Sequence, residues 1–467
     1  MGPFRRKTLK RYVSQMSAAN PNVVFDDHVA EIIEQQGFTW EEDPRSIYDP
    51  QQLYSALERY ATEWDDFECM DEHLRFGFVK AFKIFAKPRA SDYLKVLSER
   101  QVVTSALKLS KSAGLPLMSD KASSLVYSFD REEQIRLGLK QPNPCIAYKR
   151  TQQGNKTRLV WGYPLEMTIM ESRFARPLID RFLKMRTPMA FGLRKVDLGA
   201  YIHRYVVDTP GTIVALDYSK YDSTLSRTMI KQAFRILSTW FSEEEQEQWQ
   251  FSRCVSYFLY TPIVMPDGHL YHGKNHGVPS GSYFTQLVDS IVNVALCYAL
   301  SSALKFSFNA KSLLVLGDDV ILNVKGDVDL ESWANYLSTF GLQLNLTKTR
   351  VGEPHFLGAF WYKGKPDVPV EELAKKSVFP ENYRYYGGQP HREAESVLRS
   401  YASSYLSAIS LLPLQTDQRS VDFPWPGEQV IASHLSGSDR FLLEESEFHY
   451  GSEKRRSYAT LSYRILL

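Results

Sequence analysis

The chain has 467 residues, a formal net charge of +2, and 43% apolar residues, among which aromatic side chains are frequent. This length exceeds one simple core and predicts several subdomains, while the apolar fraction excludes wholesale disorder. A near-zero net charge, taken over the whole chain, argues against nucleic acid, because phosphate-binding proteins usually carry a basic surface.

Residues 1–140 are predicted to be mainly helical, with apolar residues at three- and four-residue spacing over 51–64 and 92–109. Residues 141–200 differ, because they contain eleven basic and four acidic side chains, a net charge of +7. The other residues then carry about −5 in total, by the same counting. The charge is therefore segregated along the chain, and this basic window is a candidate phosphate-binding region.

The segment 211–365 is predicted to mix strands and helices. Its expected elements are a strand at 212–216, a helix at 229–240, a hairpin of 258–264 with 269–271, a helix at 283–304, two strands at 313–316 and 320–324, and a helix at 330–340. Beyond 365, prolines surround one clear helix at 392–412, so a mostly helical subdomain is expected there.

The four cysteines are scattered, with no CxxC pair and no zinc-ligand spacing, which predicts free thiols in a reducing compartment. The uncharged, strongly apolar stretch from Ser290 to Leu304 has fifteen residues and is too short to cross a bilayer. It predicts a buried helix. These features favour a soluble intracellular protein without a membrane partner.

Two acidic elements stand at the ends of predicted strands. Asp318 and Asp319 follow Gly317 between two apolar runs, where adjacent carboxylates repel and are costly to bury. An ordinary solvated turn is the alternative for this element alone. Asp217 ends an apolar strand, and Asp222 follows after a turn. Carboxylates on neighbouring strands can share two divalent ions that support phosphoryl displacement, and all-oxygen ligation favours Mg²⁺, with Mn²⁺ as a substitute.

A glycine-rich loop opens the long helix between these two elements. Residues 277–285 are Gly-Val-Pro-Ser-Gly-Ser-Tyr-Phe-Thr, and the free N–H groups of such a loop suit contact with a nucleotide. Thr285, Asp289 and Asn293 recur at four-residue spacing, so they share one helix face. The alternative for this segment alone is a helix capped by Ser280, with polar residues facing solvent.

In this order and spacing, the three elements resemble motifs A, B and C of viral RNA-dependent RNA polymerases. The matching residues are Asp-x4-Asp at 217 and 222, Ser-Gly-x3-Thr at 280, 281 and 285, and Gly-Asp-Asp at 317–319. The resemblance implies an α+β right hand of fingers, palm and thumb, with the metal site on an antiparallel palm sheet and helices predominating elsewhere. The domains expected on this basis are an N-terminal extension and fingers (1–195), a first palm part (196–228), a fingers insertion (229–274), a second palm part (275–365), and a thumb with C-terminal region (366–467).

Four shorter matches extend the resemblance over about 110–360. Lys156 and Arg158 lie in a sequence similar to motif F, which grips the incoming triphosphate. The other three matches are Ser112, Gly114 and Pro116 with motif G near the template entrance, the segment 340–348 ending at Lys348 with motif D, and Phe356 and Leu357 with motif E, which grips the nascent strand.

The resemblance implies a role for each of these residues. Asp217 and Asp318 would hold both metal ions, with Asp319 assisting and the carbonyl of Tyr218 as a further ligand. Lys348 would donate a proton to pyrophosphate. Polar Asp222 beneath the sugar, together with Leu-Gly-Asp-Asp at 316–319 rather than the Tyr-x-Asp-Asp of reverse transcriptases, favours ribonucleotides over deoxyribonucleotides.

One position departs from the family pattern. Many RNA polymerases have Asn nine residues after the motif B Ser, where it contacts the motif A Asp and the ribose. Here that position is Asp289, and Asn293 is the nearest amide. Which of the two belongs to the ribose-recognition network stays open at this point.

The residues of motifs B and F are most similar to those in the polymerases of partitiviruses, which are cryptic viruses with double-stranded RNA genomes. This narrower resemblance implies RNA template and product, ribonucleoside triphosphates and a viral capsid protein as partners. The expected locations are the virion interior and the host cytoplasm.

Two other classes of protein compete with this interpretation. Residues 268–275, Gly-His-Leu-Tyr-His-Gly-Lys-Asn, nearly match the P-loop of an NTPase, although Asn275 lacks the hydroxyl that binds Mg²⁺ and Pro279 interrupts the helix expected there. A non-enzymatic RNA-binding structural protein of a viral particle would use the basic window alone. It would leave the buried acidic pair unexplained.

Overall fold

The computed structural model describes residues 6–18, 22–63, 67–185 and 187–413. The thumb and C-terminal region expected over 366–467 therefore falls partly outside the described residues. The helices are α1 (Arg6–Ser17), α2 (Asp27–Gln35), α3 (Pro50–Ala61), α4 (Glu72–Phe85), α5 (Glu99–Ser105), α6 (Lys121–Arg136), α7 (Leu165–Lys184), α8 (Lys195–Tyr201), α9 (Arg227–Ser238), α10 (Glu245–Tyr260), α11 (Thr285–Leu304), α12 (Leu330–Ser338), α13 (Val370–Val378) and α14 (Pro390–Ala402).

A four-stranded antiparallel sheet, here called the central sheet, has the order β10-β3-β8-β7. Its strands are β3 (Thr212–Leu216), β7 (Ser307–Leu316), β8 (Asp319–Lys325) and β10 (Arg350–Val351). Alternate residues of β8 pack into different core clusters. Val320 and Leu322 belong to the larger cluster, which includes α11, whereas Ile321 belongs to a second cluster, which includes Ile202. Burial on both faces explains why residues 313–316 and 320–322 of this hairpin are continuously apolar.

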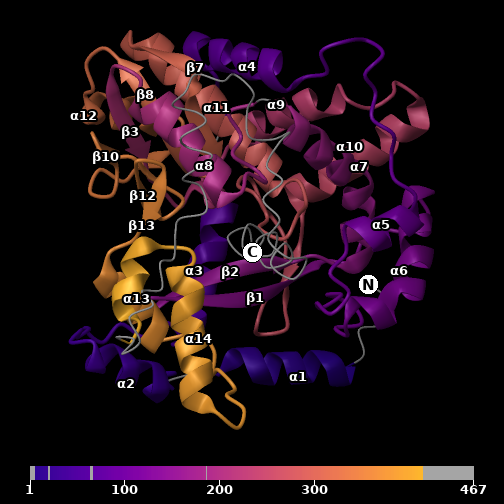
Figure 1. The fold of residues 1–467 in the computed structure, drawn as a ribbon. Coiled ribbons are helices and arrows are strands. Elements are labelled where there is room, and N and C mark those ends of the chain that lie inside the picture. Colours follow the sequence, from indigo (N-terminus) through magenta and orange to yellow (C-terminus); the bar gives the residue numbers. More distant parts are fainter. Residues whose placement is uncertain (1–5, 19–21, 64–66, 186, 414–467) are drawn as a thin grey trace.

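A second sheet, of order β2-β1-β5-β6, lies across the molecule from the central sheet (Figure 1). Its strands are β1 (Cys145–Gln152), β2 (Lys156–Gly162), β5 (Ile263–Val264) and β6 (Leu270–Tyr271). The hairpin predicted around Pro266-Asp267-Gly268 is therefore present, but shorter than expected, because 258–260 complete α10.

Two small sheets flank the central sheet. One pairs β4 (Tyr218–Ser219) with β9 (Gln343–Leu344). The other joins β11 (His355–Phe356), β12 (Ala359–Tyr362) and β13 (Lys365–Asp367) in that order.

Two predicted helices differ from the structure. In 92–109 only α5 is helical, because the preceding segment is extended and its Leu94 and Leu97 N–H groups donate to the carbonyls of Trp240 and Arg173. The helix predicted at 392–412 ends at Ala402, and a short 3₁₀ turn follows at Leu406–Leu411.

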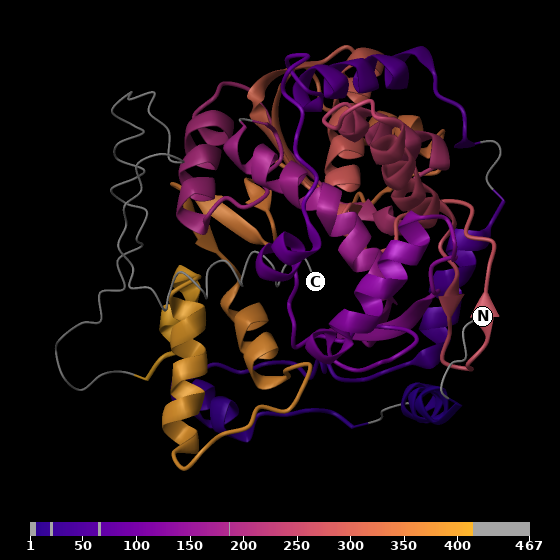
Figure 2. The same ribbon diagram turned by 90° about the vertical axis from the view of Figure 1, so that its right-hand side faces the viewer.

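Segments from both ends of the described chain pack together. Helices α13 and α14 lie beside α2 (Figures 1 and 2), and all three contribute to the second core cluster with residues behind the central sheet. Asp26, at the start of α2, accepts from Arg384 at 2.7 Å. The mostly helical region expected after 365 therefore shares a core with an N-terminal helix.

Helix α11 occupies the centre of the larger cluster, against α4 (Figure 1). Within the described ranges it is the one helix long and apolar enough to cross a membrane, and 72% of its most apolar window is buried inside the structure. Core helices pass the same test of length and composition, and this burial accords with the buried helix that the sequence predicted. Cys145, Cys254 and Cys297 are buried free thiols.

Candidate active site

The two acidic elements lie side by side at one end of the central sheet. Leu216 at the end of β3 pairs with Val320 of β8. Asp217, which follows β3, therefore lies next to the β7–β8 turn that contains Gly317 and Asp318. Gly317 has φ of +66°, a conformation that glycine adopts at little cost, so the turn can be tight.

Three carboxyl groups at this end of the sheet, those of Asp222, Asp318 and Asp319, have a pKa above the usual aspartate range. Desolvation by the surrounding residues is the main cause, although Asp222 and Asp318 keep contact with solvent and Asp319 is half-buried. The charge of Asp318 adds to the shift at Asp222 and Asp319. Asp217 adds to it at Asp318 and Asp319. The charge of Arg158 lowers the pKa of Asp222 and Asp318, so a cationic side chain already faces this cluster of like charges.

The donor set fits a hard divalent ion in charge and type. It consists of carboxylate oxygens, which Mg²⁺ and Mn²⁺ prefer. Among the described residues, no three His, Cys, Asp or Glu side chains are already grouped tightly enough to hold a metal ion. The repulsion among the clustered carboxylates is nevertheless the condition that a bound cation relieves. Ion binding would require these side chains to converge.

The main chain of Asp217 is held from the segment after α12. Its N–H donates to Thr349 Oγ1 at 3.2 Å, and its carbonyl accepts from Asn345 N at 2.8 Å. Tyr218 pairs with Leu344 in the β4–β9 ladder. Asn345 lies in the segment 340–348 that resembles motif D, whereas no local pattern in the sequence connects Thr349 with a strand so much earlier in the chain.

The Gly317 peptide is held on both sides by α11. Its N–H donates to Ser290 Oγ at 3.0 Å, and its carbonyl accepts from Asn293 Nδ2 at 2.8 Å. The Tyr218 hydroxyl donates to Asn293 Oδ1 at 3.2 Å. Ser290 and Asn293 are fully buried, so this helix fixes the turn that carries Asp318.

Asp289 and Asn293 therefore have different surroundings. Asn293 is occupied by Gly317 and Tyr218, whereas Asp289 lies among the carboxylates, since its pKa is raised first by burial and then by Asp222 and Asp318. In the described part of the chain, Asp289 Oδ1 is buried without a hydrogen-bond partner. Of the two, Asp289 is the neighbour of Asp222.

The glycine-rich loop before α11 rests on β2. Ser280 Oγ accepts from Trp161 N at 3.2 Å, and Thr285 Oγ1 donates to the Pro279 carbonyl at 2.7 Å. A Cβ at Gly281 would lie 1.8 Å from the Trp161 carbonyl oxygen. Only glycine permits this approach, which joins the loop to the strand that carries Lys156 and Arg158, both exposed.

The loop predicted to resemble motif G lies against the same hairpin. Ser112 Oγ and the Tyr148 hydroxyl on β1 are 2.7 Å apart, and Gly114 packs on the Tyr163 carbonyl just beyond β2. Pro116 is half-buried in the same loop. The predicted G and F segments are thus spatial neighbours.

The remaining predicted residues, Phe356, Leu357 and Lys348, differ in how exposed they are. Phe356 is buried in the second core cluster, so its side chain is not available to RNA, contrary to expectation. Leu357 is half-buried and lies in the turn between β11 and β12. Lys348 is exposed, between the two residues that hold the main chain of Asp217, Asn345 and Thr349.

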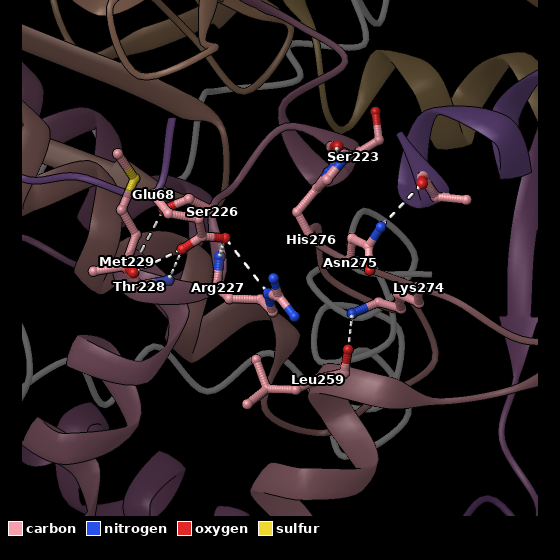
Figure 3. A network of polar contacts seen from close by, with 11 residues as sticks. Glu68, Ser223, Ser226, Arg227, Thr228, Met229, Leu259, Lys274, Asn275 and His276 are labelled. Carbon is pink, nitrogen blue, oxygen red and sulfur yellow. Dashed lines mark hydrogen bonds and ion pairs between the residues drawn. The ribbon is translucent and has the colours of Figure 1, made fainter. Parts of the chain in front are cut away.

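The segment that nearly matches a P-loop has a different structural role. Lys274 is buried, and its Nζ donates to the Phe258 and Leu259 carbonyls at the end of α10. Figure 3 shows the bond to Leu259. Burial lowers the pKa of Lys274 to about 7. His276 Nδ1 lies 2.8 Å from the Ser223 carbonyl oxygen (Figure 3). A lysine held in this way does not reach a phosphate, so the P-loop alternative is wrong.

Comparison with known proteins of similar sequence and structure supports a polymerase site. The family model of viral RNA-dependent RNA polymerase matches residues 101–396. The RNA-directed RNA polymerase of Cryptosporidium parvum virus 1 is 31% identical over 293 residues, 58% of this chain and 55% of that protein. That of White clover cryptic virus 1 is 24% identical over 273 residues, 53% of this chain and 42% of that protein. The chain thus spans about half the length of these relatives.

The crystal structure of the RNA-dependent RNA polymerase of a human picobirnavirus has a similar fold. It matches with a TM-score of 0.66 and 17% identity over 86% of this chain and 84% of that chain. This likeness confirms the expected α+β polymerase fold. The family model covers more than half of the chain, and the chain therefore belongs to the viral RNA-dependent RNA polymerase family.

Proposed function

We propose that this chain catalyses template-directed RNA synthesis and so replicates and transcribes a viral double-stranded RNA genome. In each cycle the 3′-oxygen of the nascent strand bonds to the α-phosphorus of a ribonucleoside triphosphate and loses its proton, while the bond to the β-phosphate breaks and pyrophosphate leaves. The observation that carries the proposal is the cluster of Asp217, Asp222, Asp318 and Asp319, which faces Arg158 within the region that the family model matches.

We propose Mg²⁺ as the cofactor, with Mn²⁺ as a substitute. Asp217 and Asp318 would hold two ions, with Asp319 assisting and the Tyr218 carbonyl as a further ligand. When bound, such ions activate the attacking oxygen and stabilise the leaving oxygen. The hydrogen bond from Asn345 N and the one to Thr349 Oγ1 hold the Asp217 main chain in place for this role.

The cationic side chains would act on the triphosphate. Lys156 and Arg158 are exposed on β2, and Arg158 faces the carboxylate cluster, so both would neutralise phosphate charge. Lys348 would donate a proton to the departing pyrophosphate. Its place between Asn345 and Thr349 supports this role, because both bond to the main chain of Asp217.

RNA strands would follow the neighbouring loops. We propose that Ser112, Gly114 and Pro116 contact the template, and that Leu357 contacts the nascent strand. By analogy with double-stranded RNA viruses, a capsid protein is a proposed partner, and the virion interior and host cytoplasm are the proposed locations. The experiment that tests the function is incubation of the purified chain with single-stranded RNA, ribonucleoside triphosphates and Mg²⁺. Failure to form template-length double-stranded product would contradict the proposal.

Ribose recognition is assigned to Asp222 and Asp289, with Ser280, Gly281 and Thr285 shaping the loop beneath the nucleotide. Asp222→Ala should lower discrimination between ribonucleotides and deoxyribonucleotides by about 10- to 100-fold, because a lost hydrogen bond to the 2′-hydroxyl costs about 1–3 kcal/mol. The ratio of kcat/KM values for incorporation of one NTP or dNTP measures this effect. An unchanged ratio in Asp222→Ala would remove that residue from sugar selection.

Asn293→Leu tests the link between α11 and the acidic turn. The variant should lose about 1–3 kcal/mol of unfolding free energy, because the Gly317 carbonyl and the Tyr218 hydroxyl lose a buried partner. Asn323→Leu is the matched control, since Asn323 is likewise a buried Asn with two hydrogen bonds, which it donates from β8 to two main-chain carbonyls away from the turn. Urea unfolding should show similar losses in both variants, whereas RNA synthesis should fall only in Asn293→Leu. Equal synthesis by both would contradict the link.

A further inference from the structure

Glu171 is a buried carboxyl group that none of the polymerase motifs includes. It lies on α7, is fully buried, and forms no ion pair with a described Lys, Arg or His. Burying a carboxyl group without a counter-ion is costly, so an apolar residue would serve the core better. The cost points to a specific contact made by this side chain.

That contact is with the glycine-rich loop. Glu171 Oε2 accepts from Ser282 Oγ at 2.7 Å and from Tyr283 N at 2.9 Å. Both donors come directly after Ser280 and Gly281, the residues that rest on β2. One carboxylate oxygen thus receives a side-chain and a main-chain donor from the loop, at the point where α11 begins.

We propose that Glu171 is a positioning residue that fixes the loop Ser280–Tyr283 to the fingers helix α7, and thereby sets the height of this loop beneath the incoming nucleotide. The inference rests on the proposed function and deepens it. Besides the bond that the Tyr283 hydroxyl donates to the Ala106 carbonyl after α5, the loop has two supports: β2 holds its first half through Trp161, and α7 holds its second half through Glu171. With both in place, the loop keeps a fixed distance from the strand that carries Arg158.

The electrostatics of the site agree with this role. Burial raises the pKa of Glu171 to about 8. At neutral pH the group is then largely uncharged, and its Oε2 can still accept both hydrogen bonds. The neighbouring Tyr163 hydroxyl is also buried, as is Glu171 Oε1, and neither has a hydrogen-bond partner among the described residues. The loop therefore supplies both of the hydrogen-bond donors that Glu171 Oε2 receives.

Hydrogen exchange at the Tyr283 amide tests the contact without relying on activity. Glu171→Leu should lower protection of this amide by about 10- to 100-fold, because its buried acceptor is removed. Glu171→Gln should restore most of the protection, since its amide oxygen can accept the same bonds. Glu166→Leu is the matched control, because Glu166 is equally buried on α7 but accepts from Asn143 instead.

The kinetic readout connects the contact with the nucleotide. In template-directed synthesis, Glu171→Leu should raise the KM for ribonucleoside triphosphates by about tenfold, while Glu171→Gln and Glu166→Leu stay near wild type. Ser282→Ala, which removes one donor outside the core, should show part of the effect and keeps the test open if Glu171→Leu does not fold. Tyr283 protection lost equally in Glu171→Leu and Glu166→Leu, or in Glu171→Gln and Glu171→Leu, would overturn the proposal. A chain that makes no RNA but shows the predicted exchange pattern would contradict only the proposed function.

Discussion

Asp318→Asn is expected to lower the rate of RNA synthesis by about 10³-fold or more, while binding of RNA persists. Asp318 is the carboxylate that raises the pKa of both Asp222 and Asp319, and Asp217 raises its own, so it lies centrally in the cluster. Removing its charge weakens the hold on ions whose stabilisation of transition-state charge is worth several kcal/mol, and each 1.36 kcal/mol corresponds to about tenfold in rate. Primer extension and filter binding with the same RNA measure the two quantities.

Asp327→Asn provides the matched control. Asp327 is exposed and follows the other end of β8, so it carries the same charge change away from the cluster. It should retain wild-type synthesis and RNA binding. Substantial residual synthesis by Asp318→Asn would remove this residue from catalysis, and loss of RNA binding in the same variant would favour a role in binding RNA instead.

The central sheet and its acidic turn were predictable because their signals are local. Two apolar runs interrupted by Gly317-Asp318-Asp319 predict a buried hairpin, and the structure contains β7 and β8 there. Segments 92–109 and 392–412 were less predictable, because tertiary contacts override their helical spacing. In the first of these, hydrogen bonds to Trp240 and Arg173 hold an extended chain where a helix was expected.

The supporting residues of the site could not be predicted in the same way. Thr349 and Glu171 act through partners that are distant in sequence, and neither belongs to a local pattern. Asp289 and Asn293 share one helix face, so spacing alone could not separate them. The structure separates them by their partners, because Asn293 binds Gly317 and Asp289 remains beside Asp222.

The near-zero net charge also has a physical explanation at the site. The basic window supplies Arg158 on β2, and the central sheet supplies the carboxylates that it faces. Opposite charges that meet across a site cancel in the whole-chain sum, although each is needed there. Charge counted by segment therefore predicted phosphate contact where the total did not.

Mg²⁺ is expected to stabilise the folded chain, and to do so more at about pH 8 than at about pH 6. Burial, together with Asp318 and Asp217, raises the pKa of Asp319 to about 7, above its value in the unfolded chain. The folded chain thus keeps a proton that the unfolded chain has released. The resulting stability is complete below the unfolded pKa and is lost as the pH rises through the folded pKa.

A bound divalent ion favours the ionised carboxylates, so the ion-bound chain does not lose this stability as the pH rises. The unfolding free energies with and without the ion should therefore diverge towards higher pH. An ion at about 100 times its Kd adds about 2.7 kcal/mol of unfolding free energy. Calorimetric Tm values with Mg²⁺ or EDTA across this pH range measure the divergence. The double variant Asp217→Asn with Asp318→Asn should lose the ion dependence and, in EDTA, unfold at a higher temperature than the wild type at the alkaline end. An equal response to Mg²⁺ in both proteins would place the stabilising ion elsewhere.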